Sequence, residues 1–593
     1  MRAFTISCLL AAAAFQTAFA QVLIAAETDM NSTDVTNTTT TAASASASAD
    51  TTSTLPILNS ARVLVDNNLE VDGANYPFIL LPDQRIAANG ALSCSKLGES
   101  LYSAQNSSLS SVAKMLTQYA PGETEFWIGT GSSSSSYLST CNTLVISKGQ
   151  ATGFRFQGIR YAKAPVGALR FAAPVAVSTS WSSAVDATAA GSKCPQLGDS
   201  PGGEEDCLFL NVFTPKLSAD TASALPVIIH GGSFTTGTGS DPAFNPANMA
   251  SRGQVVVVTI NYRLGLLGFL ERVDANISRS TLPGNQGVRD MIVALQWVQK
   301  NIGQFGGDSS KVTIFGESAG GNAIRTLLSM PAATNGLFRA AIAQSDPIDL
   351  PFNTADTSSR IISGEAMGLL SCTTLTCMRS QNVSAILNAQ NTIVSNAINM
   401  APEQSFLELI KPTIDGVLIF NNFDQLIAGK DGGVAKVPLM IGTMMNEANG
   451  FLPSLGQSTP MPATVFGLTL GTVLGYQRSL ATIAYGPYTI DSTDPDGTRV
   501  AEGYFASDYL WLCPTQLLAQ SYAASVGKPV YQYQFQKGYN PNRPSSDICA
   551  VNVCHGDDVA LVFASPPLMN NATAYPWTTT DAALSRTSVE KVE

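Results

Sequence analysis

The sequence has 593 residues, 45% of them apolar, and a formal net charge of −11. This is enough apolar material for a large core. Because no cluster of basic residues offers phosphate contacts, the acidity argues against nucleic acids and anionic membrane surfaces as partners.

The N-terminal residues 1–20 have the pattern of a signal peptide, with Arg2 before an apolar stretch and Ala18-Phe-Ala20 as a small-x-small cleavage site. A membrane anchor is the alternative, but the segment is short, and no other stretch approaches the ~20 apolar residues that a span needs. We expect a secreted, extracellular protein with no stable membrane anchor. Six glycosylation sequons agree with a secretory route. They are Asn31, Asn37, Asn106, Asn276, Asn382 and Asn571.

Three further regions follow the signal peptide. Residues 21–58 are dominated by Ser, Thr, Ala and Asp, which predicts a disordered stalk. Residues 59–145 differ in character and include Phe126-Trp-Ile-Gly129. They are faintly similar to a C-type lectin-like module, but a small disulfide-closed cap of unknown role is favoured. Residues 146–593 are expected to form one large α/β domain.

Two apolar runs in this domain lead into glycine-rich loops. Leu225–Ile229 predicts a strand before His230-Gly-Gly-Ser-Phe234, and Lys311–Phe315 predicts a strand before Gly316-Glu-Ser-Ala-Gly320 and a helix. A serine between glycines at a strand-to-helix turn is the pattern of a nucleophile elbow, in which Ser318 points outward. A chance glycine-rich turn is the alternative for the pentapeptide alone. The flanking strand and helix and the earlier His-Gly-Gly loop favour the α/β-hydrolase arrangement.

The serine needs a base and an acid. The chain contains two histidines, and His230 lies in a string that suits an oxyanion-hole loop, so His555 is the expected general base. The acid should lie between serine and base in chain order, where Glu447 follows the strand-like Val437–Ile441. An ordinary surface carboxylate is the alternative interpretation of Glu447.

Several longer strings surround these motifs in a consistent order. They are Phe156–Phe171, Glu205–Pro215, Asn261–Leu270, Gly284–Gly287 and Phe305–Asp308. With them the chain resembles the type-B carboxylesterase family, which includes cholinesterases, liver carboxylesterases and secreted microbial lipases and esterases. The resemblance implies an α/β-hydrolase fold, in which helices flank a central, mostly parallel β-sheet. It also implies Ser318 as nucleophile, Glu447 as triad acid and His555 as base.

The oxyanion donors implied by the resemblance are the backbone N–H groups of Gly232, Ser233 and Ala319. Two motifs depart from the family pattern: Gln344-Ser345-Asp346 stands where relatives have Gln-Ser-Gly, and Glu447 lies in Met-Met-Asn-Glu-Ala. From the reference pKa of an imidazole base, we expect activity to fall as the pH drops through roughly 6 to 7.

The cysteines are expected to pair in an oxidising compartment. The resemblance implies the disulfides Cys194–Cys207 and Cys372–Cys377. Cys94 with Cys141 and Cys549 with Cys554 are plausible further pairs, which leaves Cys513 as the odd one of the nine cysteines that remain after removal of the signal peptide. No C-x-x-C pair accompanies them, so a zinc site is disfavoured, and we expect no metal and no cofactor.

The substrate class depends on the segment between Cys194 and Cys207, because the resemblance places the lid of lipases there. Here it contains one leucine and no hydrophobic face, so we expect a small-molecule ester substrate with a short or medium acyl chain. The segment also lacks a tryptophan that could bind a quaternary ammonium, which disfavours choline esters. A lipase or sterol esterase for long-chain esters is the alternative, followed by a non-catalytic recognition protein of the same fold. The oligomeric state is left open.

Overall fold

The computed structural model describes short strands between residues 62 and 144 and, with gaps, residues 153–565. The gaps are 178–184, 199–201, 216–222, 273–276, 349, 401–407, 430–432, 452–461, 475, 487, 495, 539–547 and 551. The predicted signal peptide, the predicted stalk and all the sequons except Asn382 lie outside the described residues.

A nine-stranded sheet forms the centre of the α/β part. Its spatial order is β15-β14-β13-β12-β10-β11-β9-β8-β7. The strands are β7 (Asn142–Leu144), β8 (Gly153–Arg160), β9 (Phe209–Thr214), β10 (Ser223–Ile229), β11 (Val257–Ile260), β12 (Gly307–Glu317), β13 (Ala340–Gln344), β14 (Leu439–Met444) and β15 (Val530–Phe535). The six strands from β15 to β11 run parallel, and the three at the other edge are antiparallel to their neighbours.

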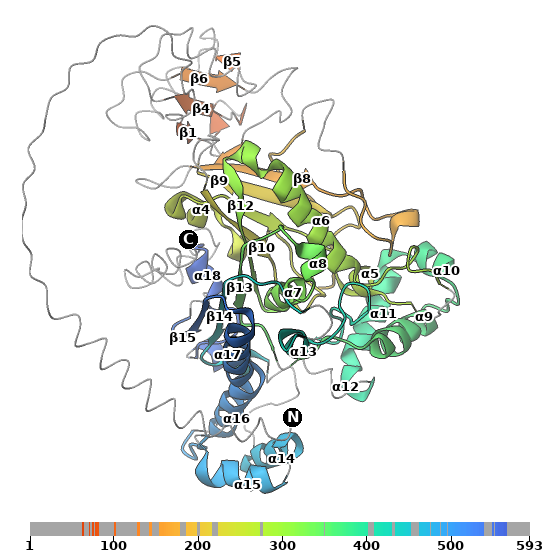
Figure 1. Ribbon diagram of the computed structural model, residues 1–593, viewed down its shortest axis with the longest axis vertical. Helices are drawn as coiled ribbons and strands as arrows, with labels where there is room; N and C mark the ends of the chain where they lie inside the picture. The colour runs from red at the N-terminus through yellow and green to blue at the C-terminus, as the bar shows by residue number, and fades with distance from the viewer. Residues whose placement is uncertain are drawn as a thin grey trace, which may run out of the picture. The chain divides into compact units, whose positions relative to one another are not determined.

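The central strands are buried and mostly apolar, as in β11 and in the Val312–Phe315 part of β12, because helices cover both faces of the sheet. Val227 and Ile229 of β10 belong to the larger core, whereas Ile228 between them faces a second core on the opposite side. The larger core includes α6 (Gln286–Asn301), α7 (Ala319–Leu328) and α17 (Cys513–Val526), and the second includes α4 (Ala247–Gly253) and α18 (Val559–Val562) (Figure 1). The predicted α/β-hydrolase fold, with a mostly parallel sheet flanked by helices, is confirmed.

The described part of the chain also forms further helices. The α-helices are α5 (Gly265–Phe269), α8 (Pro331–Thr334), α9 (Gly364–Leu369), α10 (Leu375–Ser380), α11 (Val383–Ser395), α12 (Ala397–Met400), α13 (Phe423–Ile427), α14 (Ala463–Leu474), α15 (Tyr476–Tyr485) and α16 (Gly497–Ser507). Short 3₁₀ and π turns are η1 (Gly167–Leu169), η2 (Pro242–Phe244), η3 (Ile302–Phe305), η4 (Thr357–Ser363), η5 (Glu447–Gly450), η7 (Asp508–Leu512) and η8 (Ile548–Ala550). None of the helices in the described part of the chain is long and apolar enough to cross a membrane.

The described part of the chain divides into two compact units, one within residues 458–502 and one made of the described residues of 57–457 and 503–593. The described part of the first unit holds α14, α15 and the start of α16. The second unit holds the nine-stranded sheet and all the residues discussed below.

The region 59–145 contributes short strands. Four of them form an antiparallel sheet in the order β1-β4-β6-β5, and β2 pairs with β3. These strands are β1 (Arg62–Leu64), β2 (Glu70–Val71), β3 (Ala74–Asn75), β4 (Phe78–Leu81), β5 (Ser100–Leu101) and β6 (Trp127–Thr130). The last strand of the region, β7, pairs with β8 and so belongs to the nine-stranded sheet.

Candidate active site

Ser318 sits at a sharp turn between β12 and α7. Its backbone angles are φ 60° and ψ −125°, a left-handed conformation that costs a non-glycine residue of order 1–3 kcal/mol. The flanking glycines make the turn possible. A Cβ on Gly316 would lie 2.4 Å from the carbonyl oxygen of Gly320, and a Cβ on Gly320 would lie 2.2 Å from that of Ile229. This is the geometry of a nucleophile elbow, with Ser318 at the N-terminus of α7.

The His-Gly-Gly-Ser-Phe loop lies directly against this turn. A Cβ on Gly231 would come within 3.0 Å of the Ser318 Cβ. The next three residues all have positive φ: Gly232 at 107°, Ser233 at 51° and Phe234 at 56°. The loop therefore stores backbone strain beside the serine and depends on its surroundings to hold it. Fully buried Phe234 is one anchor, because its ring packs edge-on against Phe269 at 5.2 Å.

His230 packs the base of this loop. Its ring stacks on Tyr262 with the centroids 4.5 Å apart, and the Tyr262 hydroxyl donates to the His230 carbonyl oxygen at 2.9 Å. Burial lowers the pKa of His230 to about 4, so the ring is neutral at physiological pH. The same ring places its Nδ1 2.8 Å from the carbonyl oxygen of Gly231.

His555 and Glu447 are hydrogen-bonded although 108 residues separate them. His555 Nδ1 lies 2.6 Å from Glu447 Oε2, and Glu447 Oε1 accepts from the Met444 N–H at 2.6 Å. Two hydrogen bonds hold the two loops together: the Asn446 N–H donates to the Val553 carbonyl at 2.9 Å, and the Val553 N–H donates to the Asn446 side chain, at Oδ1, at 3.1 Å. Glu447 is fully buried, so it is not an ordinary surface carboxylate.

Glu317 is a second carboxylate at the same histidine, and the sequence did not single it out. Its Oε1 lies 3.3 Å from His555 Nε2. Burial raises the pKa of Glu317 to about 7, an effect that the positive charge on His555 opposes and the negative charge on Glu447 reinforces. The only sequence signal for Glu317 was its position inside the elbow pentapeptide.

The carboxylates also change the expected titration of the histidine. Burial by itself lowers the pKa of His555, but Glu317 and Glu447 outweigh that effect and raise it to about 9. The sequence predicted a value near the reference of an imidazole. The difference arises because the tertiary structure brings one carboxylate to each ring nitrogen.

The two aspartates beside His555 contact other groups. Asp557 Oδ2 accepts from the Cys554 N–H at 2.9 Å, and buried Asp558 accepts from the Gln344 side chain at 2.8 Å. Burial raises the pKa of Asp558 well above its usual value. Both aspartates thus take part in building the loop that carries the histidine.

Asp346, the unexplained departure from the family pattern, forms a buried ion pair. Arg325 of α7 donates from Nε to Asp346 Oδ2 at 2.8 Å and from Nη2 to Oδ1 at 3.0 Å. Arg325 also donates to the Leu350 carbonyl at 3.2 Å. Because α7 begins at the elbow, this pair fixes the helix of Ser318 to the end of β13.

Three disulfides are resolved within the described residues. Their Cα–Cα distances are 4.9 Å for Cys194–Cys207, 5.4 Å for Cys372–Cys377 and 5.6 Å for Cys549–Cys554. Cys513 is also disulfide-bonded, so its interpretation as the odd cysteine was wrong. Sequence spacing could not reveal this, because pairing depends on which cysteines the fold brings together. Cys94 and Cys141 lie outside the described residues.

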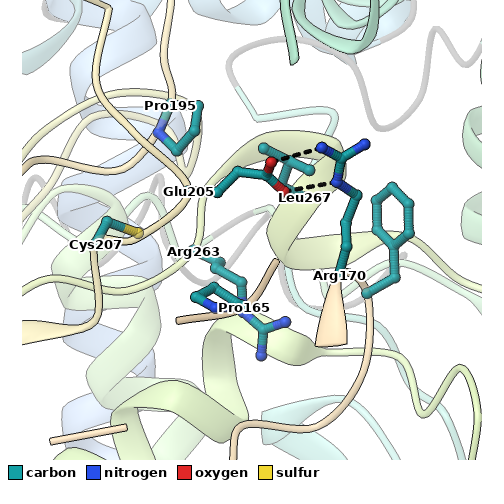
Figure 2. A pocket seen from close by; sticks show the side chains of 8 residues that line it. Pro165, Arg170, Pro195, Glu205, Cys207, Arg263 and Leu267 are labelled. Carbon is teal, nitrogen blue, oxygen red and sulfur yellow. Dashed lines mark hydrogen bonds and ion pairs between the residues drawn. The ribbon is translucent and has the colours of Figure 1, made fainter. Parts of the chain in front are cut away.

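A small pocket lies beside the Cys194–Cys207 disulfide, lined by Pro165, Arg170, Phe171, Pro195, Glu205, Cys207, Arg263 and Leu267 (Figure 2). Both arginines have carboxylate partners. Arg170 Nε donates to Glu205 at 2.6 Å, and Arg263 Nη2 donates to Asp290 at 2.7 Å. The Arg170–Glu205 pair joins two of the sequence motifs, and the Arg263–Asp290 pair joins a third motif to α6, so these motifs help to hold the fold together. Across the described ranges, no group of three His, Cys, Asp or Glu side chains could hold a metal ion.

Comparison with known proteins agrees with this arrangement. The family model described as "Carboxylesterase family" matches residues 144–592. The chain belongs to the carboxylesterase family. The para-nitrobenzyl esterase of Bacillus subtilis is 34% identical over 402 residues, which cover 66% of this chain and 76% of that protein. Carboxylesterase 1F of Mus musculus is 31% identical over 455 residues, 70% of this chain and 77% of that one.

A solved structure of a PNB esterase superposes with a TM-score of 0.60 at 28% identity, covering 75% of this chain and 86% of that one. A solved structure of a thermophilic PNB esterase gives a TM-score of 0.60 at 27% identity and covers 75% of this chain and 86% of that one. The carboxylesterase is therefore a carboxylic ester hydrolase, and family members act on small-molecule esters.

Proposed function

We propose that this carboxylesterase is a secreted enzyme that hydrolyses short or medium acyl esters through an acyl-enzyme formed on Ser318. The observation that carries the proposal is the hydrogen bond of 2.6 Å between His555 Nδ1 and buried Glu447, on a histidine whose Nε2 lies beside Glu317, the residue before the elbow serine. A nucleophile at a strained turn and a histidine oriented by a carboxylate are the parts that acyl transfer requires.

In the proposed reaction His555 Nε2 takes the proton of Ser318 as its oxygen attacks the ester carbonyl. The same nitrogen returns the proton to the departing alcohol, and water repeats both steps on the acyl-enzyme. Glu447 fixes the tautomer with the proton on Nδ1 and stabilises the transient imidazolium.

The negative oxygen of the tetrahedral intermediate would be bound by the backbone N–H groups of Gly232, Ser233 and Ala319. The close approach of Gly231 to Ser318 supports this placement, and Ala319 is the first residue of α7, where the helix dipole favours negative charge. Loss of one such donor typically costs about 3 kcal/mol of transition-state stabilisation.

Three observations support the finer parts of the proposal. The disulfides suit an oxidising, extracellular compartment, and the sequon residue Asn382 is exposed at the start of α11. The segment between Cys194 and Cys207 is tied down by Gln196, which is buried, and this favours dissolved esters over a lid that opens at a lipid interface.

The assignment of the nucleophile is tested with a fluorophosphonate probe on Ser318→Ala and on a matched control, Ser345→Ala. Ser345 also follows a parallel strand and has positive φ, at 49°, so it is the nearest structural equivalent. We expect labelling to vanish in Ser318→Ala and to persist in Ser345→Ala. Labelling that survives in a folded Ser318→Ala protein would refute the assignment.

Substrate class is tested by initial rates on nitrophenyl esters of increasing acyl length, each below and above its solubility limit. We expect fast turnover of dissolved short chains. A rate that rises only above the solubility limit would favour the alternative, a lipase or sterol esterase, and no turnover would favour a non-catalytic relative.

A further inference from the structure

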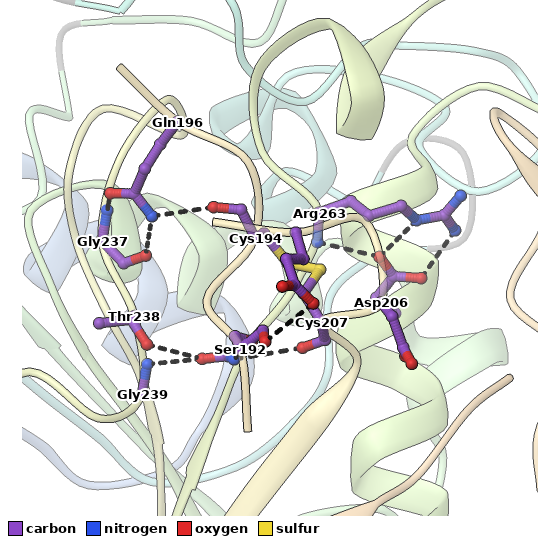
Figure 3. Close-up of a disulfide and its surroundings, with 12 residues drawn as sticks. Ser192, Cys194, Gln196, Asp206, Cys207, Gly237, Thr238, Gly239 and Arg263 are labelled. Atoms are coloured by element: carbon purple, nitrogen blue, oxygen red, sulfur yellow. Dashed lines mark hydrogen bonds and ion pairs between the residues drawn. A yellow bond between two sulfur atoms is a disulfide. The ribbon is translucent and has the colours of Figure 1, made fainter. Parts of the chain in front are cut away.

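The buried side chain of Gln196 joins the Cys194–Cys207 loop to the segment that follows residues 230–234, here called the oxyanion loop. Its Nε2 donates to the Gly237 carbonyl at 2.9 Å, and its Oε1 accepts from the Gly237 N–H at 2.9 Å. Figure 3 shows this reciprocal pair beside the disulfide. The carboxamide thus satisfies both backbone groups of Gly237, as a neighbouring β-strand would, and it fixes that peptide in two directions.

Gly237 in turn packs closely against His230 and Gly231 of the oxyanion loop. Its φ is +107°, and a Cβ there would lie 2.3 Å from His230 Nδ1 and 2.5 Å from the Gly231 carbonyl oxygen. The backbone of Gly237 is therefore packed directly on the His230 ring and on Gly231. Any displacement of Gly237 moves the loop that lies against Ser318.

The oxyanion loop needs such support because three successive residues, Gly232 to Phe234, have positive φ. Strained backbone persists only where its surroundings hold it. Phe234 anchors the loop in the core. After Phe234 the chain turns back, with the Thr236 N–H donating to the Gly232 carbonyl at 2.9 Å, and Gly237 follows this turn. Gln196 is the side chain that holds the turn at Gly237.

Hydrogen bonds within the Cys194–Cys207 loop hold Gln196 in place. Gln196 Nε2 also donates to the Cys194 carbonyl at 3.1 Å, and its backbone N–H donates to the Gly202 carbonyl at 2.8 Å across the disulfide loop. The side-chain amide of Asn261 makes a similar connection between the other half-cystine and the same segment. Its Nδ2 donates to the Cys207 carbonyl at 3.1 Å, and its Oδ1 accepts from the Gly239 N–H at 2.8 Å. Both half-cystines are thus tied to the segment 237–239 (Figure 3).

We propose that Gln196 is a positioning residue for the oxyanion donors, and that the disulfide loop of this enzyme braces the oxyanion loop. The proposal rests on the proposed function, because it assumes that the N–H groups of Gly232 and Ser233 bind the developing oxyanion. Gln196 does not touch the substrate. It acts through Gly237 and His230 on the geometry of those donors, which must be set to a fraction of an ångström to stabilise the transition state.

The test compares Gln196→Met with a matched control, Gln299→Met, in the full chain. Gln299 Nε2 also donates to two backbone carbonyls, those of Ser309 and Leu337, each at 2.9 Å, but it lies on α6. Both substitutions remove an amide that bonds the backbone, and we expect both to lower the melting temperature slightly. We expect kcat to fall roughly 10- to 100-fold in Gln196→Met, with KM within about 2-fold, and to stay unchanged in Gln299→Met.

The decisive readout is the inhibition constant of a trifluoromethyl ketone, whose adduct mimics the tetrahedral oxyanion, with active sites counted by phosphonate titration. We expect this constant to rise in Gln196→Met by the same factor by which kcat/KM per active site falls. A role limited to folding would reduce the number of active sites and leave both constants unchanged, and that result would overturn the proposal.

Gln196→Glu provides a second variant if the methionine variant does not fold. It keeps an acceptor for the Gly237 N–H and loses the donor to the Gly237 carbonyl, so kcat should again fall with little change in KM. Wild-type values in this variant would overturn the proposal. If wild-type protein neither turns over esters nor is labelled at Ser318, it is the proposed function that fails, whatever the variants do.

Discussion

Replacement of Glu317 by Gln should move the pH dependence of the enzyme to lower pH. The carboxylate lies 3.3 Å from His555 Nε2, the nitrogen that must be deprotonated for His555 to act as base. Its charge stabilises the imidazolium, and the pKa of His555 stands at about 9 as a result of Glu317 and Glu447 together. In the wild-type enzyme the acid limb of kcat/KM should therefore lie well above 7.

The size of the effect follows from these values. The rise of the His555 pKa from its usual 6.5 to about 9 corresponds to roughly 3.5 kcal/mol in favour of the protonated ring. Two carboxylates share that effect, and direct Coulomb attraction at 3.3 Å with an effective dielectric constant of about 20 gives about 5 kcal/mol as an upper bound. If Glu317 supplies half of the net effect, the acid limb should fall by roughly one pH unit in Glu317→Gln.

The assay measures kcat/KM for a dissolved short-chain nitrophenyl ester between pH 5 and about 10, because the pH dependence of this ratio reports the pKa values of ionisable groups in the free enzyme. Glu365→Gln is the control, because Glu365 is an exposed carboxylate on α9 and its substitution removes the same charge. We expect the limb to stay in place in the control. An unchanged limb in Glu317→Gln, or a wild-type limb near 6.5, would refute the argument that Glu317 raises the pKa of His555.

Two further substitutions test the buried carboxylates. Asp346→Asn leaves Arg325 without its buried partner and should lower the free energy of unfolding by about 3–5 kcal/mol in urea titrations. Asp356→Asn breaks an exposed ion pair and should leave the free energy of unfolding nearly unchanged, so equal effects of the two substitutions would contradict the structural role of the Asp346–Arg325 pair. Glu447→Gln should lower kcat by roughly 10³- to 10⁴-fold without loss of folding, as judged by circular dichroism, because His555 loses the carboxylate that fixes its tautomer; near-normal kcat would remove Glu447 from the mechanism.

Local patterns in the sequence were enough to predict the elbow and the fold class. Ser318 lies between glycines that the turn requires, since a Cβ at Gly316 or Gly320 would collide with backbone. The apolar strands before it and the order of serine, Glu447 and His555 along the chain predicted an α/β-hydrolase, and family membership agrees. Such features are visible in sequence because each depends on residues close together in the chain.

Contacts between distant segments were decided only by the tertiary structure. Glu447 and His555 meet because the loop after β14 pairs with the loop after η8, and Glu317 reaches the same ring from β12. Four further features cannot be read from the sequence. They are the raised pKa of His555, the disulfide at Cys513, the Asp346–Arg325 ion pair and the two hydrogen bonds between Gln196 and Gly237. Charge, burial and hydrogen bonding depend on distances in space, and residue types along the chain determine those distances only once the whole core has formed.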